Sequence, residues 1–190
     1  MTLGPWVSFL GTYEVALSFD HTTLTSHAEL AVEGTKKFLM ENPDATVDAI
    51  SEAVTNQQMA SALKSQDKIH IFVRAAFTPQ FFKSKEVEKY ASAVAKITNK
   101  GINMERHLIA ALEGLCIDKP KNFPVFIKQL YDEDALDEDV ILEWAAEGRN
   151  DFTLPTVDEE TRATLRGEAE PVVVWLQAAD SDDEESDDEE

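Results

Sequence analysis

Apolar residues recur at spacings of three and four along most of the chain, from about residue 28 onward. This spacing places apolar side chains on one face of a helix, whereas a half-buried strand would alternate them at every second position. The pattern therefore predicts a succession of helices and requires no strand in this stretch. Their expected ranges are 28–41, 46–63, 67–77, 85–98, 104–117, 123–132, 137–147, 158–165 and 169–178.

Local residues mark several of the expected helix ends. Thr46 can cap the second helix, because its hydroxyl can accept a hydrogen bond from the first turn. Thr156 and Glu159 have the spacing of a capping box, and Gly167 suits the end of the helix that follows them. Short connections favour antiparallel neighbours, either in a closed bundle or in an α-solenoid of stacked helix pairs. We favour the solenoid within an all-α fold.

The two ends of the chain depart from this pattern. Residues 1–27 receive no assigned element: the first 20 are apolar, but glycine, proline and glutamate interrupt them and no lysine or arginine precedes them. We therefore expect neither a membrane span nor a signal peptide there. Residues 180–190 carry nine acids and no apolar side chain, so we expect a disordered acidic tail. The helical domain is expected to cover residues 28–179.

Charge is distributed unevenly over the 190 residues. Aspartate and glutamate number 37 against 17 lysines and arginines, which gives a net charge of −20. Residues 129–190 hold 23 of the acids and 3 of the bases, whereas residues 36–128 carry a net charge of +4. Such an acidic chain is a poor partner for DNA and favours a cationic partner. A single cysteine, Cys116, excludes an intramolecular disulfide and suits a reducing, cytoplasmic location.

Sequence motifs for catalysis are absent from the chain. It contains no glycine-rich nucleotide-binding motif, no phosphate loop, no zinc-protease helix and no nucleophile elbow. His107 and Cys116 each lack the partners of an activated nucleophile, and we interpret them as packing or surface residues. We therefore expect a non-enzymatic protein without a cofactor or a metal ion.

Cationic residues cluster in the middle of the chain, within 24 positions. They are Lys83, Lys85, Lys89, Lys96, Lys100 and Arg106. A solvated helix face explains them most simply, and we favour that interpretation. The alternative is a basic docking patch for an acidic protein segment or for RNA. RNA is the weaker choice, because no exposed aromatic residues alternate with these bases as a stacking platform would require.

Acidic and aromatic residues occur together twice near the C-terminus. Asp139, Glu143 and Glu147 repeat at every fourth position beside the apolar face that contains Trp144. Like charges at that spacing repel by roughly 0.2–0.5 kcal/mol per pair, so helix stability does not explain them. Trp175 ends an apolar run directly before the acidic tail. Core packing is the favoured role of both tryptophans. It is compatible with a groove in which their edges and the nearby carboxylates receive lysine side chains.

These two segments resemble the two boxes of aromatic and acidic residues that end the C-terminal W2 domain of eukaryotic translation initiation factor 5. The first box is Asp137 to Trp144 and the second is Pro171 to about Glu185. The stretch TNQQMASALKSQDKIHIFVRAAFTPQFFKSKEVEKYA and the later MERHLIAALEGLC are also similar to that domain, so the resemblance covers about residues 28–188. It implies a HEAT-like helical domain of that protein, or a stand-alone mimic of it, that assembles or regulates preinitiation complexes.

The resemblance also implies partners. The box residues would bind lysine-rich segments of the initiation factor 2 beta subunit, and a subunit of initiation factor 3. They are Glu138, Asp139, Glu143, Trp144, Trp175, Asp182, Asp183, Glu184 and Glu185, and Glu147, which follows the first box, is counted with them. The cationic cluster would face initiation factor 1 or the scaffold factor 4G. The arginine and zinc ribbon of the factor 5 GTPase-activating region have no counterpart here, so that activity is not expected.

The tail adds one candidate modification and one alternative function. Ser181 and Ser186 are each followed by Asp-Asp-Glu, which resembles a casein kinase two acceptor site, and phosphorylation would add negative charge. The alternative function is an acidic chaperone for histones or other basic proteins, in which the tail acts and the helices are a scaffold. In either case we expect a monomer that binds neither DNA nor a membrane.

Overall fold

Eight helices run through the part of the chain that the computed structural model describes, residues 21–78, 81 and 85–184. Side chains are described from His27 to Ala178 within these ranges. The helices are α1 (His21–Glu41), α2 (Val47–Ala60), α3 (Asp67–Ala76), α5 (Glu86–Thr98), α6 (Ile102–Cys116), α7 (Asn122–Asp132), α8 (Glu138–Ala146) and α9 (Glu159–Glu184). No strand occurs in these ranges, which confirms the predicted all-α fold for them.

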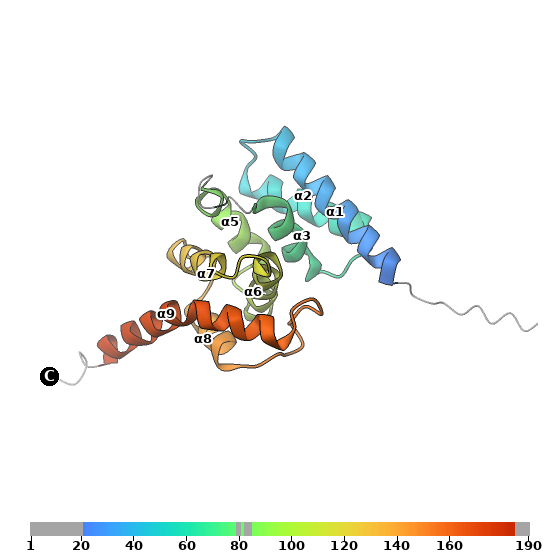
Figure 1. The fold of residues 1–190 in the computed structure, drawn as a ribbon. Coiled ribbons are helices and arrows are strands. Elements are labelled where there is room, and N and C mark those ends of the chain that lie inside the picture. Colours follow the sequence, from blue (N-terminus) through green and yellow to red (C-terminus); the bar gives the residue numbers. More distant parts are fainter. Residues whose placement is uncertain (1–20, 79–80, 82–84, 185–190) are drawn as a thin grey trace, which may run out of the picture.

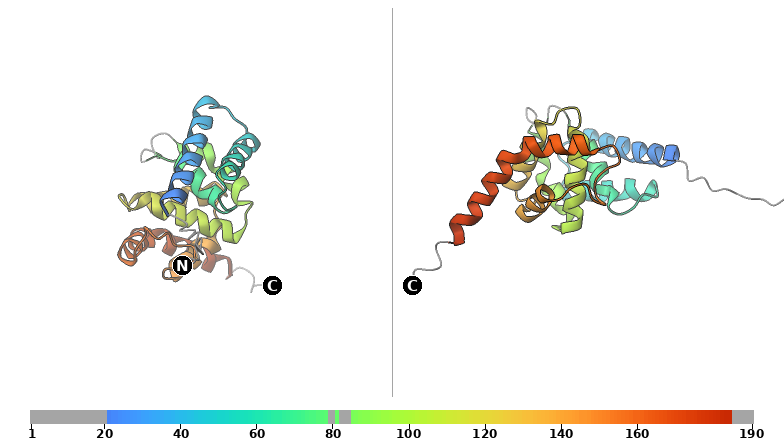
Figure 2. Two further views of the ribbon diagram at one scale, coloured as in Figure 1. Left: turned by 90° about the vertical axis from the view of Figure 1, so that its right-hand side faces the viewer. Right: turned by 60° about the horizontal axis from the view of Figure 1, so that its bottom comes forward.

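The helices stack in the order of the sequence (Figure 1). α1, α2 and α3 pack on one another at one end, α6 packs on α3 in the middle, and α8 and α9 close the opposite end. α7 lies against α6 on one side and against α9 on the other. The views in Figure 2 show the same succession from two further directions. This arrangement is the predicted stack of helix neighbours.

One continuous hydrophobic core joins the ends of the stack. It contains Phe72 of α3, Leu112 of α6, Phe126 of α7, Ile141 of α8 and Leu176 of α9, all of which are buried. Removing apolar surface from water stabilises such packing by about 25 cal/mol per Å². The acidic C-terminal helices are therefore anchored in the same core as the rest of the domain.

Helix α1 begins at His21, seven residues before the predicted start at 28. Residues 21–26 are polar apart from Leu24, so they lack the apolar periodicity on which the prediction rested. Part of the segment 1–27 that received no assigned element is thus helical. Residues 1–20 lie outside the described ranges.

Helix α9 is one continuous helix, where the sequence predicted two helices at 158–165 and 169–178. Gly167 lies inside it and does not end it. Leu165, Ala169 and Leu176 follow helical spacing across this glycine and are all fully buried, so packing overrides the local stop signal. Pro171 also lies inside the helix. Proline removes one backbone hydrogen bond, and Figure 2 shows α9 bending near its middle.

The helix caps differ in how well the sequence predicted them. Thr46 caps α2 as predicted, with its hydroxyl oxygen 3.2 Å from the amide nitrogen of Ala49. At the start of α9 the predicted capping box is wrong, because Asp158 takes the capping role. Its carboxylate accepts a hydrogen bond from the amide of Thr161 at 2.8 Å, which lowers the pKa of Asp158. Val157 is fully buried, and this packing fixes where α9 begins.

The C-terminal end of α9 reaches into the predicted tail. The backbone is helical through Glu184, and residues 185–190 lie outside the described ranges. The predicted disorder of the acidic tail stays a prediction for those last residues. None of the helices in the described ranges has the combination of length and apolar character that crossing a bilayer requires.

Candidate functional site

Trp144, the last residue of the first box, lies in the core. Its side chain is 6% exposed and packs on Phe123, with ring centroids 4.9 Å apart. The indole Nε1 donates a hydrogen bond to Oε1 of Glu113 on α6 at 2.8 Å. Trp144 therefore braces α8 from the inside, and a partner could contact no more than its edge.

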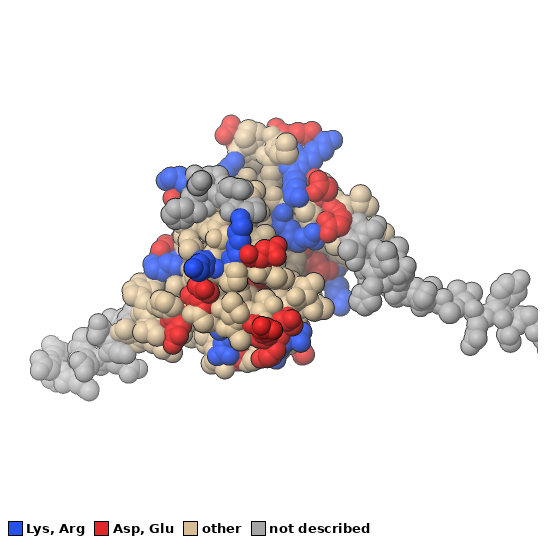
Figure 3. All heavy atoms as spheres, viewed as in Figure 1, with Lys and Arg blue, Asp and Glu red and all other residues tan. Residues whose placement is uncertain are grey.

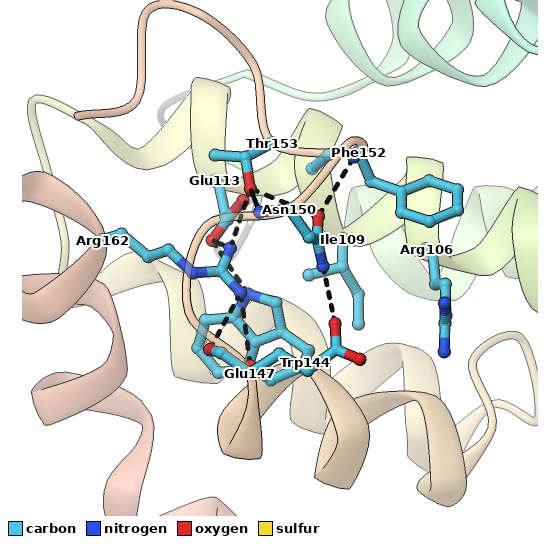
Figure 4. A pocket seen from close by; sticks show the side chains of 10 residues that line it. Arg106, Ile109, Glu113, Trp144, Glu147, Asn150, Phe152, Thr153 and Arg162 are labelled. Carbon is cyan, nitrogen blue, oxygen red and sulfur yellow. Dashed lines mark hydrogen bonds and ion pairs between the residues drawn. The ribbon is translucent and has the colours of Figure 1, made fainter. Parts of the chain in front are cut away.

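Arg162 completes a buried network around Trp144 (Figure 4). Its guanidinium donates to Glu113 Oε1 at 2.7 Å and to the backbone carbonyls of Trp144 and Glu147 at 3.3 and 3.4 Å. Arg162 and Glu113 are 2% and 1% exposed, so this ion pair is shielded from water. The network joins α6, α8 and α9 at the end of the domain that carries both boxes.

Two opposing effects act on the Glu113 carboxyl. Burial raises its pKa, because a low-dielectric interior disfavours the charged form. The hydrogen bond from Trp144 and the charge of Arg162 oppose that shift. The short contact to Arg162 and the hydrogen bond from the indole both suit an ionised carboxylate. We conclude that Glu113 is held as an anion by two donors.

The cavity next to this network is small. Arg106, Phe152 and Thr153 help to line it, together with the buried residues of the network. Its volume is about 10 Å³, which is close to the space of one water molecule. It has no room for an organic molecule in this conformation.

The acidic residues of the first box differ in their partners. Glu143 forms an ion pair with Arg106, and Glu147, just after the box, accepts a hydrogen bond from the side-chain amide of Asn150 at 2.7 Å. Glu138 is half-buried, and its Oε2 lies 3.5 Å from the Tyr131 hydroxyl. Asp139 is exposed and has no ion pair among the described residues. Among the acids of the first box, Asp139 is thus an exposed one that no cation of the described residues occupies.

Trp175 of the second box is exposed, in contrast to Trp144. Its side chain is 43% exposed and lies beside α7. The Tyr131 ring packs on it nearly at a right angle, with centroids 5.6 Å apart, and the Lys128 Nζ lies 4.1 Å from the ring centroid. Because Tyr131 also approaches Glu138, α7 connects the two boxes. The remaining acidic residues of the second box, Asp182, Asp183, Glu184 and Glu185, have no described side chains, and neither have Ser181 and Ser186.

The predicted cationic cluster is largely paired with acids. Lys85 pairs with Glu88, Lys96 with Asp48, Lys100 with Asp134 and Asp137, and Arg106 with Glu143. Lys89 lies 5.1 Å from the Tyr90 ring centroid, and Lys83 lies outside the described ranges. Figure 3 shows cationic and anionic side chains intermixed on the face it presents. Two of the cations thus bind residues at the first box, and the described members do not form a separate unpaired patch.

A larger groove lies away from the boxes, with a volume of about 700 Å³. It is lined by residues of α1, α3 and α6, including Val32, His70 and Leu115, and by the loop before α9. None of the predicted site residues lines this groove. The candidate site is therefore the surface formed by α7, α8 and α9.

Comparison with known proteins identifies this part of the chain. Residues 104–186 match the W2 family, described as eIF4-gamma/eIF5/eIF2-epsilon. A solved structure of the C-terminal domain of translation initiation factor 5 at low pH matches with a TM-score of 0.62. That match covers 83% of this chain and 97% of the solved chain, at 19% sequence identity. Residues 104–186 therefore form a W2 domain, and the described helices share the fold of the initiation factor 5 C-terminal domain. Its HEAT-like helical fold is the one that the sequence predicted.

Relatives of this W2 domain are initiation factors of plants, animals and yeast. Eukaryotic translation initiation factor 5 of Zea mays is 37% identical over 118 residues, which is 62% of this chain and 23% of the relative. Probable eukaryotic translation initiation factor 5-2 of Arabidopsis thaliana is 31% identical over 112 residues, which is 55% of this chain and 24% of the relative. The match thus spans about a quarter of the length of these two proteins.

Sequence reasoning missed four residues that organise the W2 domain. Arg162 and Glu113 were missed because single charged residues are usually exposed. A signal existed, since Arg162 lies three positions before Leu165 and seven before Ala169, on the apolar stripe of α9. Lys128 and Tyr131 precede the first box and carry no box-like pattern. Their role depends on how α7 packs against α9.

Proposed function

We propose that this W2 domain acts in translation initiation as a non-enzymatic interaction module. Its partners in this proposal are lysine-rich segments of the initiation factor 2 beta subunit, and a subunit of initiation factor 3. The proposal rests above all on one observation: the exposed ring of Trp175 lies on the surface that also carries the acidic residues of α7 and α8. The names of the relatives support the process, and a cytoplasmic location follows from it.

Lysine has the chemistry that this surface can bind. Its aliphatic stem can lie along an indole ring while its ammonium group remains near carboxylates and water. Asp139 offers an exposed carboxylate, and Oε1 of Glu138 is buried without a hydrogen-bond partner among the described residues. A run of lysines could therefore contact the ring and the acids together. The acidic end of the chain would also steer such a segment towards the site.

The cationic cluster receives weaker support as a second docking surface. Binding of initiation factor 1 or factor 4G there would have to compete with the acids that already pair with Lys100 and Arg106. Exposed ion pairs contribute at most about 1 kcal/mol each, so the competition is feasible but unfavourable. We therefore assign the main interaction to the boxes.

The proposal is tested by equilibrium binding of a lysine-rich peptide from the initiation factor 2 beta subunit at two salt concentrations. A scrambled peptide of equal charge is measured beside it. We expect the native peptide to bind more tightly than the scrambled one, and both to weaken with salt, because counterions screen charges over about 8 Å at physiological ionic strength. Equal binding of the two peptides would instead favour the acidic chaperone.

Reversing one accessible box charge is expected to weaken binding. Asp139→Lys should lower the affinity about 30-fold, since the reversal changes the charge by two units and each unit charge near a partner's ammonium in water changes the interaction by about 1 kcal/mol. Glu52→Lys is the matched control, because Glu52 is an exposed acid on α2, which packs on α1, α3 and α5 and not on the box helices. Isothermal titration calorimetry compares the two variants. The same loss in both would show that net charge matters and that the box does not.

Deleting residues 180–190 separates the box hypothesis from the chaperone hypothesis. The box hypothesis predicts that weakened peptide binding survives, because Trp175 and the first box remain. The chaperone hypothesis predicts nearly complete loss, because the tail carries nine acids. Binding of purified histones to the full and shortened chains serves as the comparison.

A further inference from the structure

The Trp175 ring already has a lysine on it. Lys128 of α7 places its Nζ 4.1 Å from the ring centroid, within the range of a cation–π contact. The same Nζ donates to Oδ1 of Asp132 at 2.5 Å, one helical turn further along α7. The ammonium is therefore held between an indole and a carboxylate, which is the environment that the proposed function offers to a partner's lysine.

The sequence of α7 fixes this arrangement. Lys128, Tyr131 and Asp132 are three and four positions apart, so they share one face of the helix. Lys128 and Tyr131 on that face contact Trp175 of α9, and Asp132 reaches this place through its ion pair with Lys128. Tyr131 packs on the ring from the same helix. Together the three residues of α7 form a site in which the lysine belongs to the chain itself.

The lysine is held loosely enough to leave. The Lys128 and Asp132 side chains are 36% and 48% exposed, and Trp175 is 43% exposed. Ion pairs between residues four apart on an exposed helix face are weak, and solvent-exposed cation–π contacts are weak as well. A second ammonium group from outside can therefore compete for the ring and for the Asp132 carboxylate.

We propose that Lys128 occupies, in the free domain, the place on Trp175 and Asp132 that a partner's lysine takes on binding. The inference rests on the proposed function and adds to it the residue that the partner displaces. Lys128 then acts as an internal competitor that lowers the affinity for any lysine-rich segment. It also sets a threshold, because a segment with one lysine gains little from exchanging one ammonium for another, whereas a segment with several gains further contacts to the acids nearby.

The test compares Lys128→Met with Lys121→Met. Methionine keeps an unbranched apolar stem and removes the ammonium. Lys121 is an exposed lysine directly before α7 with no ion pair among the described residues, so its variant makes the same change in net charge. The probe is an oligolysine peptide, measured by calorimetry. We expect Lys128→Met to bind about threefold to fivefold more tightly than Lys121→Met, which is the loss of competition from one exposed cation–π contact.

The ring must be required for this gain. In a Trp175→Leu background, Lys128→Met should bind no more tightly than Lys121→Met, because the shared place is gone. Equal affinities of the two lysine variants in the natural background would overturn the inference and leave the proposed function standing. Failure of the unmodified chain to bind the peptide would instead remove the proposed function.

A second measurement follows Lys128 directly. Protons near the face of an indole resonate upfield, so the side-chain protons of Lys128 should be shifted in the free protein. Their assignment comes from comparison with the Lys128→Met spectrum. On addition of saturating oligolysine peptide, these resonances should return to ordinary lysine positions. Resonances that stay upfield while the peptide is bound would show that the partner does not displace Lys128.

Discussion

Replacing Arg162 by methionine is expected to destabilise the W2 domain by about 3–5 kcal/mol. The guanidinium is the cationic partner of Glu113, which is 1% exposed, so its removal leaves a buried carboxylate without a counter-charge. Two carbonyl groups, those of Trp144 and Glu147, lose a donor at the same time. Urea denaturation followed by far-ultraviolet circular dichroism measures the change in the free energy of unfolding.

Two variants control this prediction. Glu88→Ala removes one carboxylate from an exposed ion pair with Lys85 and should change stability by less than about 1 kcal/mol. The double variant Glu113→Gln and Arg162→Met removes both buried charges and should be more stable than Arg162→Met alone. A double variant that is less stable than the single one would contradict the interpretation that the stranded charge causes the loss.

Acidification is expected to weaken the domain through His70. Burial, the largest effect, lowers the pKa of His70 from 6.5 to about 4. As the pH falls, His70 therefore binds a proton near pH 6.5 in the unfolded chain, but only near pH 4 in the folded chain. Stability from this group is complete above pH 6.5 and is lost as the pH falls towards 4, at about 1.4 kcal/mol per pH unit. The loss over this window amounts to about 3 kcal/mol.

The surroundings of His70 explain the direction of this shift. His107 lies 3.4 Å away, ring nitrogen to ring nitrogen, and it lowers the pKa of His70 further, as does Arg74. Asp67 acts in the opposite direction. His70→Gln should flatten the dependence of unfolding free energy on pH between 6.5 and 4, and His27→Gln, at an exposed histidine of α1, is the matched control variant. Parallel curves for His70→Gln and the unmodified chain would contradict the prediction.

Most helices could be predicted from the sequence, because a helix that is buried on one face has apolar residues at spacings of three and four. Helix α7 was predicted within one residue of its start, since its apolar positions follow helical spacing. The break predicted at Gly167 failed for a physical reason. A glycine weakens a helix locally by about 1 kcal/mol, and the buried stripe on both sides of it outweighs that loss.

The sequence did not predict which of the two tryptophans is buried. Trp144 and Trp175 both stand next to acids in the chain, yet one is 6% exposed and the other 43%. The difference depends on Glu113 and Arg162, which lie 31 and 18 positions from Trp144. The pairing of the cationic cluster was not predictable either, because Lys100 pairs with acids 34 and 37 positions away in the sequence. Such pairings arise from the stacking of helices and leave no local pattern.

The buried network also decides how this domain can be divided and reused. Arg162 comes from the first turn of the helix that carries the second box, and it holds the carbonyl end of the helix that carries the first. A protein shortened to end before Arg162 would lose the second box. Glu113 of α6 would then lack its counter-charge, as it does in Arg162→Met. Neither box is therefore an independent segment that would keep its structure when transferred alone to another protein. The two boxes depend on each other for folding. A recombinant protein that separates them would be unstable, and this loss of stability would act before any partner binds.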